Sequence, residues 1–383
     1  MKIALANLYY LPVQGGIEKY MYELAKRFQR EHEVEIIAGG GRLGERLRYS
    51  DGLREYRIPF VEPRMTTAWL TIAGMFVPAC AYRISNSDFD MVHANCVPSA
   101  YAAMKASKKK PFVFTQHNNE EIIRTYAHFV GVKLYETIMS KIIENAASII
   151  SVSKSVAKEM ESRYGVKSKT IYNGVDLDFF TPENDGKEFR DRYSLGDSRI
   201  VLFVGKIDKR KGLEYLAHAF EKVKRNVKNT KLVIVGKTRF EEDSYLNKIM
   251  EMMEAFGILD SVYFTGEISI EMLQEAYRAC DVFVMPSITE TFGIVVIEAM
   301  ASGKPVVVTR SGGPEELVVD GKNGFVVGPR DSEALADRII TILTDESLAE
   351  RMGRYGRIHA ERNFNWDKTA VETMKVYEDA LSE

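Results

Sequence analysis

The chain has 383 residues, too many for one ordinary core and about the right number for two domains of roughly 100–200 residues each. Hydrophobic residues make up 45% and charged residues 28%, a composition that excludes a disordered chain, a collagen-like chain and a disulfide scaffold. With 52 basic and 54 acidic side chains the net charge is −2, so the chain as a whole does not attract nucleic acid or anionic lipid.

The first residues do not have the pattern of a secretory signal peptide. One early lysine is followed by a short apolar run that polar residues and Pro12 interrupt. The three cysteines, Cys80, Cys96 and Cys280, are far apart and show neither paired nor zinc-binding spacing, which fits a reducing compartment. We therefore expect a cytoplasmic protein without disulfides.

Short β-branched runs alternate with longer amphipathic segments, the pattern of a doubly wound parallel sheet, and this pattern occurs twice. In the first half a helix is predicted over residues 17–30. Strands are predicted over residues 2–8, 33–38, 90–95, 111–117 and 148–153. The later strands end in polar residues, at the edge where an open parallel sheet binds its ligands.

One uncharged stretch, Met65–Tyr82, lies between Arg64 and Arg83. Threonines, Gly74 and Pro78 dilute its hydrophobicity, and a membrane-spanning helix needs about 20 predominantly apolar residues. A packed helix is the favoured interpretation, and a surface that touches a membrane is the alternative. The second interpretation predicts peripheral contact with the inner face of a membrane.

The segment 171–189 is rich in Asn, Gly, Asp and Pro and is the best candidate for a linker. It separates a first domain over 1–175 from a second over 190–365. In the second domain, strands are predicted over residues 199–205, 231–236, 261–266, 281–287, 305–309 and 324–328. The final helix, 366–383, has an apolar stripe that must be buried, and we expect it to join the first domain.

The strongest local signal is the segment 281–309, which reads as strand, loop, helix and strand. Its helix should begin near Phe292 and Gly293, at the carboxyl edge of the sheet. A helix N-terminus presents N–H groups and a partial positive charge to an anion, and glycine allows the backbone to approach it closely. Thr291, Phe292 and Gly293 are therefore candidates for binding a diphosphate.

Two carboxylates, Glu290 and Glu298, bracket this helix start with seven residues between them. At a helical rise they are about 12 Å apart, too far to share a proton or a metal ion. A nucleotide sugar fits this spacing, with Glu290 accepting from sugar hydroxyls and Glu298 from ribose hydroxyls. Alternatively, Glu290 is an ordinary loop carboxylate and Glu298 a solvated helix residue. The apolar neighbours of Glu298 favour a function, because a buried unpaired carboxylate is costly.

A second loop, after the strand at 199–205, carries Lys206, Lys209, Arg210 and Lys211. Clustered cations at the carboxyl end of a strand suit a phosphate leaving group. The spacing is not that of a Walker loop. A solvated turn would be the better interpretation if this loop stood alone.

Weaker signals lie in the first domain. Gly15 and Gly16 would let a ligand approach the first strand-to-helix loop, although a tight turn explains them equally well. His93 and His117 both lie at predicted strand ends, and His117 is the better candidate for a role at the sheet edge.

Two patterns point to other functions. Gly39, Gly41 and Gly44 match a dinucleotide fingerprint and would suit an NAD-dependent oxidoreductase, but the segment that follows lacks helical amphipathicity. Asp176 and Asp178 form an acidic pair of the kind that binds a metal-diphosphate, but turn chemistry explains them.

Together these residues resemble the retaining glycosyltransferases of family 4, over nearly the whole chain. The matching elements are Gly15, Gly16 and Glu18, His117, the segment Tyr172–Asp176, the pair Glu290 and Glu298, and Gly312–Leu317. Lys211 matches the lysine of the family's phosphate site. Lys206 stands where the family commonly has an arginine, and it lacks the bidentate fork of that side chain.

The resemblance implies the GT-B fold, in which two Rossmann-like, doubly wound parallel-sheet domains face each other across a cleft. It also implies a retaining, metal-independent hexosyltransferase. The donor would be a nucleotide-diphosphate sugar bound by the second domain, with a UDP-sugar favoured and GDP-mannose as the second candidate. The acceptor hydroxyl, on a glycan, glycolipid or small molecule, would bind the first domain. Such an enzyme would serve glycan, glycolipid or cell-envelope polysaccharide synthesis.

The resemblance also assigns roles to residues. The catalytic set is His117, Lys206, Lys211 and Glu290. The donor-binding set is Gly16, Thr291, Phe292, Gly293 and Glu298. No metal or other cofactor is expected, since the nucleotide sugar is a substrate, and no nucleic acid is expected as a partner. A non-catalytic nucleotide-sugar-binding protein is the remaining alternative.

Overall fold

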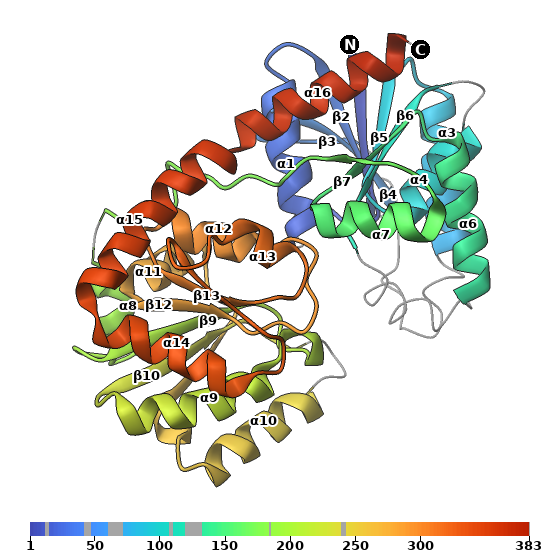
Figure 1. Ribbon diagram of the computed structural model, residues 1–383. Helices are drawn as coiled ribbons and strands as arrows, with labels where there is room; N and C mark the ends of the chain where they lie inside the picture. Colours follow the sequence, from blue (N-terminus) through green and yellow to red (C-terminus); the bar gives the residue numbers. More distant parts are fainter. Residues whose placement is uncertain are drawn as a thin grey trace. The chain divides into compact units, whose positions relative to one another are not determined.

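The computed structural model describes residues 1–11, 15–41, 47–59, 72–106, 110–118, 132–183, 185–238 and 243–382. The chain divides into two compact units. Unit 1 is Met1–Asn173 together with Trp366–Glu383, and unit 2 is Gly174–Asn365 (Figure 1). Each unit contains its own sheet with helices around it, so each is an α/β unit.

The sheet of unit 1 has the strand order β3-β4-β2-β1-β5-β6-β7-β8. All neighbouring strands pair in parallel except β3 and β4, which form an antiparallel hairpin. The strands are β1 (Lys2–Asn7), β2 (Glu33–Gly41), β3 (Leu47–Ser50), β4 (Leu53–Pro59), β5 (Met91–Ala94), β6 (Phe112–Gln116), β7 (Ser148–Ser151) and β8 (Lys169–Thr170).

Helices cover both faces of this sheet, and the alternation of side chains along β1 shows why. Ile3 and Leu5 are buried in the core under α1 and α16, whereas Ala4 and Ala6 are buried in the core with α3, α4 and α6. A strand buried on both faces is apolar throughout, as expected for a parallel sheet. The helices are α1 (Gly16–Phe28), the π-helical turn η1 (Ile72–Phe76), α3 (Val77–Ser85), α4 (Val97–Ala106), α6 (Val132–Asn145), α7 (Lys154–Tyr164) and α16 (Trp366–Ser382).

The C-terminal helix α16 returns to unit 1 and packs beside α1 (Figure 1). Trp366 and Tyr377 are completely buried in the core on this face. The Tyr377 hydroxyl lies 2.6 Å from Nδ1 of His93, a buried residue of β5. The hydroxyl of Thr369 donates to the carbonyl of Tyr172 at 2.8 Å. The helix is therefore held by both apolar burial and specific hydrogen bonds.

The sheet of unit 2 has the order β11-β10-β9-β12-β13-β14, and all its strands pair in parallel. The strands are β9 (Arg199–Val204), β10 (Thr230–Val235), β11 (Val262–Gly266), β12 (Val282–Met285), β13 (Val306–Thr309) and β14 (Gly324–Val327). The helices are α8 (Lys187–Arg192), α9 (Leu213–Asn226), α10 (Asp243–Ala255), α11 (Ile270–Ala279), α12 (Ile294–Ala301), α13 (Gly313–Leu317), α14 (Ser332–Thr344) and α15 (Glu346–Asn363), with the 3₁₀ turns η2 (Lys209–Lys211) and η3 (Leu259–Ser261).

Every strand that the sequence predicts is present, with shifts of a few residues at the ends. The sequence analysis missed β3, β4 and β8, which are short or lie near the edges of the sheet. The doubts about the dinucleotide fingerprint are confirmed, because the described residues that follow it, 47–59, form the hairpin β3–β4 instead of a helix. Gly44 itself lies outside the described residues.

The uncharged stretch Met65–Tyr82 is described from residue 72 onward. Its buried side chains recur every four residues at Ile72, Phe76 and Cys80, and the same spacing continues to Ile84 just beyond the stretch. These side chains pack in the core of unit 1, so the packed-helix interpretation is confirmed for this part. Within the described ranges of the chain, no helix is both long and apolar enough to cross a membrane. Contact with a membrane surface stays a prediction.

We predict that Tyr377→Phe lowers the free energy of unfolding of unit 1 by about 1–2 kcal/mol, because His93 then loses a buried partner. Urea unfolding followed by tryptophan fluorescence measures this effect, since Trp69 and Trp366 both fall in the residue ranges of unit 1. Val371→Ala, at a position of α16 that is 70% exposed, is the control and should leave the midpoint nearly unchanged. Equal stability of both variants would show that the hydroxyl does not anchor α16.

Candidate functional site

The candidate site lies in unit 2, at the carboxyl ends of β9 and β12. These strands are neighbours in the sheet, and the strands that follow them lie on opposite sides, β10 beside β9 and β13 beside β12. Open parallel sheets bind ligands at such a switch point. The loops over 205–212 and 286–293 both leave the sheet there.

Backbone hydrogen bonds join these loops to each other and to the loop after β13. The amide of Ile288 donates to the carbonyl of Arg210 at 2.7 Å. The amide of Glu290 donates to Ser311 at 2.9 Å, and the amide of Gly313 donates to Glu290 at 3.0 Å. The backbone around Glu290 is therefore held on both sides.

Gly212 shows how closely the first two loops approach. Its φ is +65°, a left-handed conformation that favours glycine. A Cβ atom here would lie 2.2 Å from the carbonyl oxygen of Pro286. Only glycine fits between the end of β12 and the start of α9, and this contact places Lys211 next to Glu290.

The central feature is an ion pair between the ammonium of Lys211 and Oε2 of Glu290. Both side chains are only 15% exposed. The amide of Thr291 donates to the other carboxylate oxygen of Glu290 at 3.1 Å. Burial by itself would raise the pKa of Glu290, but the charge of Lys211, with help from Arg210 and the Thr291 amide, holds this pKa below its ordinary value. Glu290 is therefore ionised at neutral pH.

This pairing was not predicted from the sequence, which assigned Lys211 to phosphate and Glu290 to sugar hydroxyls. Thr291 was a candidate for binding phosphate through its amide, but that amide donates to Glu290. The ion pair is local to unit 2 and joins two loops that are 79 residues apart in the chain. The spacing of residues in the sequence does not show a pair whose members are so far apart in the chain.

The predicted helix start is confirmed, since α12 begins at Ile294 with Gly293 as its N-cap. Gly293 has a φ of +92°, so its backbone conformation alone favours glycine, whether or not an anion binds. No side chain in the described part of unit 2 caps this helix. The amide of Val296 donates to the carbonyl of Gly293 at 2.9 Å. The amides before it lie at the end of the helix that suits an anion. The ring of Phe292 is buried and packs edge-on against Phe364.

Glu298 is buried on α12, as its apolar neighbours predicted. The alternative of a solvated helix residue is therefore wrong. The hydroxyl of Tyr277 on α11 donates to Oε2 of Glu298 at 2.9 Å, so the buried carboxylate has a partner within the protein. The predicted distance of about 12 Å assumed that both glutamates lie on one helix. Glu290 lies before the start of α12, so this distance does not apply. The two carboxylates are nevertheless held by different partners, Lys211 and Tyr277.

The other cations of the first loop differ in their surroundings. The guanidinium of Arg210 pairs with Asp208 at 2.7 Å, and Asp208 also accepts from the amide of Arg210 at 2.9 Å. Lys206 and Lys209 are exposed. Lys211 thus forms an ion pair with Glu290, and Arg210 adds its charge from the same loop while it pairs with Asp208.

In unit 1 the two candidate histidines have different surroundings. His93 is completely buried, with Nδ1 2.6 Å from the Tyr377 hydroxyl and Nε2 2.6 Å from the Thr115 hydroxyl, so it belongs to the core. His117 follows β6 at the carboxyl edge and is 7% exposed, with Nε2 3.2 Å from Oδ1 of Asn95. Burial lowers the pKa of both histidines to about 3, so both are neutral at physiological pH.

The glycine pair lies at the start of α1, where Gly15 is the N-cap and Gly16 the first helical residue. A side chain at Gly15 would collide with Oε2 of Glu18, which is 8% exposed. The acidic pair in the linker forms a turn, since Oδ1 of Asp176 accepts from the amides of Asp178 and Phe179. Among the described residues, no three His, Cys, Asp or Glu side chains form a group that could hold a metal ion.

Comparison with known proteins decides the family. The model described as "Glycosyltransferase Family 4" matches residues 14–179, and the model described as "Glycosyl transferases group 1" matches residues 185–359. The chain belongs to glycosyltransferase family 4.

Relatives of this glycosyltransferase match it along nearly its whole length. Spore coat protein SA of Bacillus subtilis is 30% identical over 399 residues, which cover 99% of each chain. The GDP-mannose-dependent alpha-(1-6)-phosphatidylinositol monomannoside mannosyltransferase of Mycolicibacterium smegmatis is 29% identical over 368 residues, covering 93% of this chain and 92% of the relative. The structure of sucrose-phosphate synthase from Thermosynechococcus elongatus superposes with a TM-score of 0.86 at 25% identity and covers 100% and 99% of the two chains. The GT-B fold is therefore confirmed.

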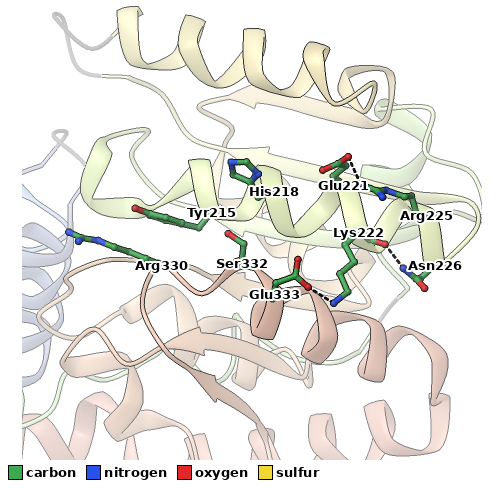
Figure 2. Close-up of a pocket in the computed structure, with 9 residues that line it drawn as sticks. All are labelled: Tyr215, His218, Glu221, Lys222, Arg225, Asn226, Arg330, Ser332 and Glu333. Carbon is green, nitrogen blue, oxygen red and sulfur yellow. Dashed lines mark hydrogen bonds and ion pairs between the residues drawn. The ribbon is translucent and has the colours of Figure 1, made fainter.

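The glycosyltransferase also has a hollow in unit 2 that none of the predicted site residues lines. This cavity of about 460 Å³ lies between α9 and the start of α14. Figure 2 shows the side chains that line it. Several of its charges neutralise one another, with Lys222 2.6 Å from Glu333 and Arg225 paired with Glu221. It is lined by Tyr215, His218, Glu221, Lys222, Arg225, Asn226, Arg330, Ser332 and Glu333.

The Lys211–Glu290 pair predicts how the stability of unit 2 depends on pH. Because folding lowers the pKa of Glu290, the pair stabilises the fold above the ordinary glutamate pKa and is lost as pH falls. In Lys211→Met the burial remains and the ammonium is gone, so the pKa of Glu290 should instead rise. At pH 7 this variant should lose about 2–3 kcal/mol of unfolding free energy, and the deficit should shrink as the pH falls and vanish only below the lowered pKa of Glu290.

Urea unfolding of the wild type and Lys211→Met at several pH values measures this difference. The double variant Lys211→Met/Glu290→Gln is the control, because it removes both charges and should show no such dependence on pH. A deficit of constant size between pH 7 and pH 4 would contradict the pairing.

Proposed function

We propose that this chain is a hexosyltransferase that moves a sugar from a nucleotide-diphosphate sugar to an acceptor hydroxyl. The observation that carries the proposal is the Lys211–Glu290 ion pair at the switch point of unit 2, beside the N-terminus of α12. This arrangement places a cation, a carboxylate and a helix N-terminus together. A sugar diphosphate presents the matching groups, which are hydroxyls and phosphate oxygens.

In this proposal unit 2 binds the donor. The ammonium of Lys211 has three protons, and its bond to Glu290 leaves two to donate to phosphate oxygens. The first amides of α12 and the exposed Lys206 add positive potential for the charge that develops on the departing diphosphate. Glu290, ionised at neutral pH, accepts hydrogen bonds from the hydroxyls of the transferred sugar. Glu298, beside Tyr277, is assigned to the ribose.

The proposed chemistry retains the anomeric configuration. A double displacement of the glycosidase type needs two carboxylates that flank the anomeric carbon, and Glu290 and Glu298 are each held by a separate partner. We favour attack from the face that the diphosphate leaves. The bond between the anomeric carbon and the phosphate oxygen breaks, and the bond to the acceptor oxygen forms. The acceptor proton passes to the departing diphosphate.

The sugar donor is to be identified by experiment, and there are two candidates. A UDP-sugar is favoured by the sequence analysis, and the name of the mannosyltransferase relative supports GDP-mannose. The acceptor is proposed to bind unit 1, and a glycolipid acceptor would agree with peripheral membrane contact. The test is a screen of UDP-, GDP- and ADP-sugars for thermal stabilisation, followed by assays of sugar transfer and nucleotide release.

The screen also separates the alternative functions. A non-catalytic sensor would be stabilised by a nucleotide sugar and would release no nucleotide with any acceptor. An oxidoreductase would be stabilised by NADH and by none of the nucleotide sugars. Either result would overturn the proposal.

We predict that Glu290→Ala and Lys211→Ala each lower the rate of sugar transfer by about a hundredfold or more, the effect of losing one contact in the transition state. Glu254→Ala and Lys228→Ala change exposed charges elsewhere in unit 2 and should keep the wild-type rate. The measured quantity is the rate of sugar transfer from one nucleotide-sugar donor. Near-normal turnover in both site variants would remove the site assignment.

We also predict that transfer does not depend on a divalent metal ion, because Lys211 and the amides of α12 provide the positive charge for the diphosphate. Excess EDTA should leave the initial rate unchanged within about twofold. Rates measured after dialysis against the chelator, with and without added Mg²⁺ or Mn²⁺, provide the check. Loss of activity with EDTA and recovery with either ion would contradict this prediction.

A further inference from the structure

Asn95 immediately follows β5 at the carboxyl edge of unit 1, and sequence analysis did not select it. Its side chain is 1% exposed. Its backbone amide donates to the carbonyl of Ala6 in β1 at 2.9 Å, which fixes the residue at the end of both strands. From this position the side chain reaches across to His117, which follows the neighbouring strand β6.

The amide group of Asn95 can satisfy both of its contacts in one orientation only. Its Nδ2 donates to the carbonyl of His93 at 3.3 Å, and its Oδ1 lies 3.2 Å from Nε2 of His117. The reversed orientation would place Oδ1 against the His93 carbonyl, so that two acceptors would meet. Burial makes such a contact costly, because no water replaces the lost hydrogen bond.

This orientation determines which nitrogen of His117 carries the proton. A carbonyl-type oxygen such as Oδ1 only accepts, so Nε2 of His117 must donate to it. The ring is neutral, since burial lowers its pKa to about 3, and a neutral imidazole has one N–H. Nδ1 of His117 is therefore the unprotonated nitrogen, and it can only accept a hydrogen bond.

The carbonyl of His93 is itself held in place. β5 pairs in parallel with β1 and β6, with His93 opposite Leu5 and Val113, and this backbone pairing holds the carbonyl independently of the His93 ring. The ring of Tyr20 packs edge-on against His117, with centroids 4.9 Å apart. These buried contacts hold Asn95 and His117 against each other at the edge of the sheet.

We propose that Asn95 is a positioning residue that holds His117 in the Nε2-protonated tautomer, so that Nδ1 accepts a hydrogen bond from a carbohydrate hydroxyl. The second half of this statement rests on the proposed function. A neutral ring that offers a lone pair selects a hydroxyl, which can donate, over a phosphate or carboxylate oxygen, which cannot. This selectivity fits recognition of the sugar rather than of the diphosphate.

Two-bond ¹H–¹⁵N correlation spectra of the full chain test the tautomer directly, because they distinguish a protonated ring nitrogen from an unprotonated one. The signals of His117 are identified by their loss in His117→Gln. In the wild type, Nε2 of His117 should be protonated and Nδ1 unprotonated. A wild-type signal from His117 with its proton on Nδ1 would overturn the proposal. In Asn95→Leu, which removes the acceptor, the share of the Nδ1-protonated form should rise.

Ligand titrations and kinetics test the contact with sugar. UDP-glucose or GDP-mannose should shift the Nδ1 resonance of His117, whereas UDP or GDP, which have no sugar hydroxyls beyond the ribose, should not. Asn95→Leu should lower kcat/KM for sugar transfer about tenfold or more and leave the dissociation constant of the free nucleotide unchanged.

Thr115→Val is the matched control, because it removes a buried hydrogen bond of His93 and leaves the Asn95–His117 contact in place. It should keep the wild-type tautomer and kcat/KM. Equal losses in Asn95→Leu and Thr115→Val would show a general effect of core damage and overturn the positioning role. If the wild type shows the expected tautomer but transfers no sugar, the proposed function fails while the tautomer assignment stands.

Discussion

The ion pair between Lys211 and Glu290 is the interaction on which the candidate site depends. Two charged side chains that are mostly removed from water are stable only because each compensates the other. The pair also joins the loop after β9 to the loop after β12, and Gly212 lets those loops come close enough to form it. Charge, loop geometry and the protonation state of Glu290 are therefore consequences of one contact.

The same contact supports the proposal that the site binds a polar, phosphorylated ligand. A carboxylate that remains ionised although buried is a strong hydrogen-bond acceptor, and a lysine with spare protons is a strong donor. Beside them, the N-terminus of α12 adds the amides and the partial charge of a helix end. A rigid backbone around Glu290, bonded to Ser311 and Gly313, keeps these groups oriented before any ligand arrives.

Unit 1 uses its buried polar groups differently. His93 is surrounded by the hydroxyls of Tyr377 and Thr115 and is part of the structure that anchors α16. His117 is held by Asn95 at the edge of the sheet, where one ring nitrogen is committed to the protein. Two histidines that look alike in the sequence therefore have separate tasks, and the difference comes from which elements surround each ring.

Much of the fold was accessible from the sequence, because parallel strands buried on both faces read as apolar runs such as those of β9, β10 and β12. The start of α12 and the loop with Glu290 were found from the order of strand, loop and helix. The strands β3, β4 and β8 were missed. β3 and β8 are short strands at the edges of the sheet, and β4 carries Arg54, Glu55 and Arg57, so it does not read as an apolar run.

The sequence by itself determined the fold class, the strand ends that bear polar residues and the membership in a glycosyltransferase family, because these depend on local patterns along the chain. Only the tertiary structure showed that Lys211 meets Glu290, that Tyr277 satisfies Glu298 and that Asn95 meets His117. Each of these contacts joins residues that lie 21 to 79 positions apart. Such contacts depend on how separate helices, strands and loops pack against one another. The spacing of residues along the chain does not show this packing.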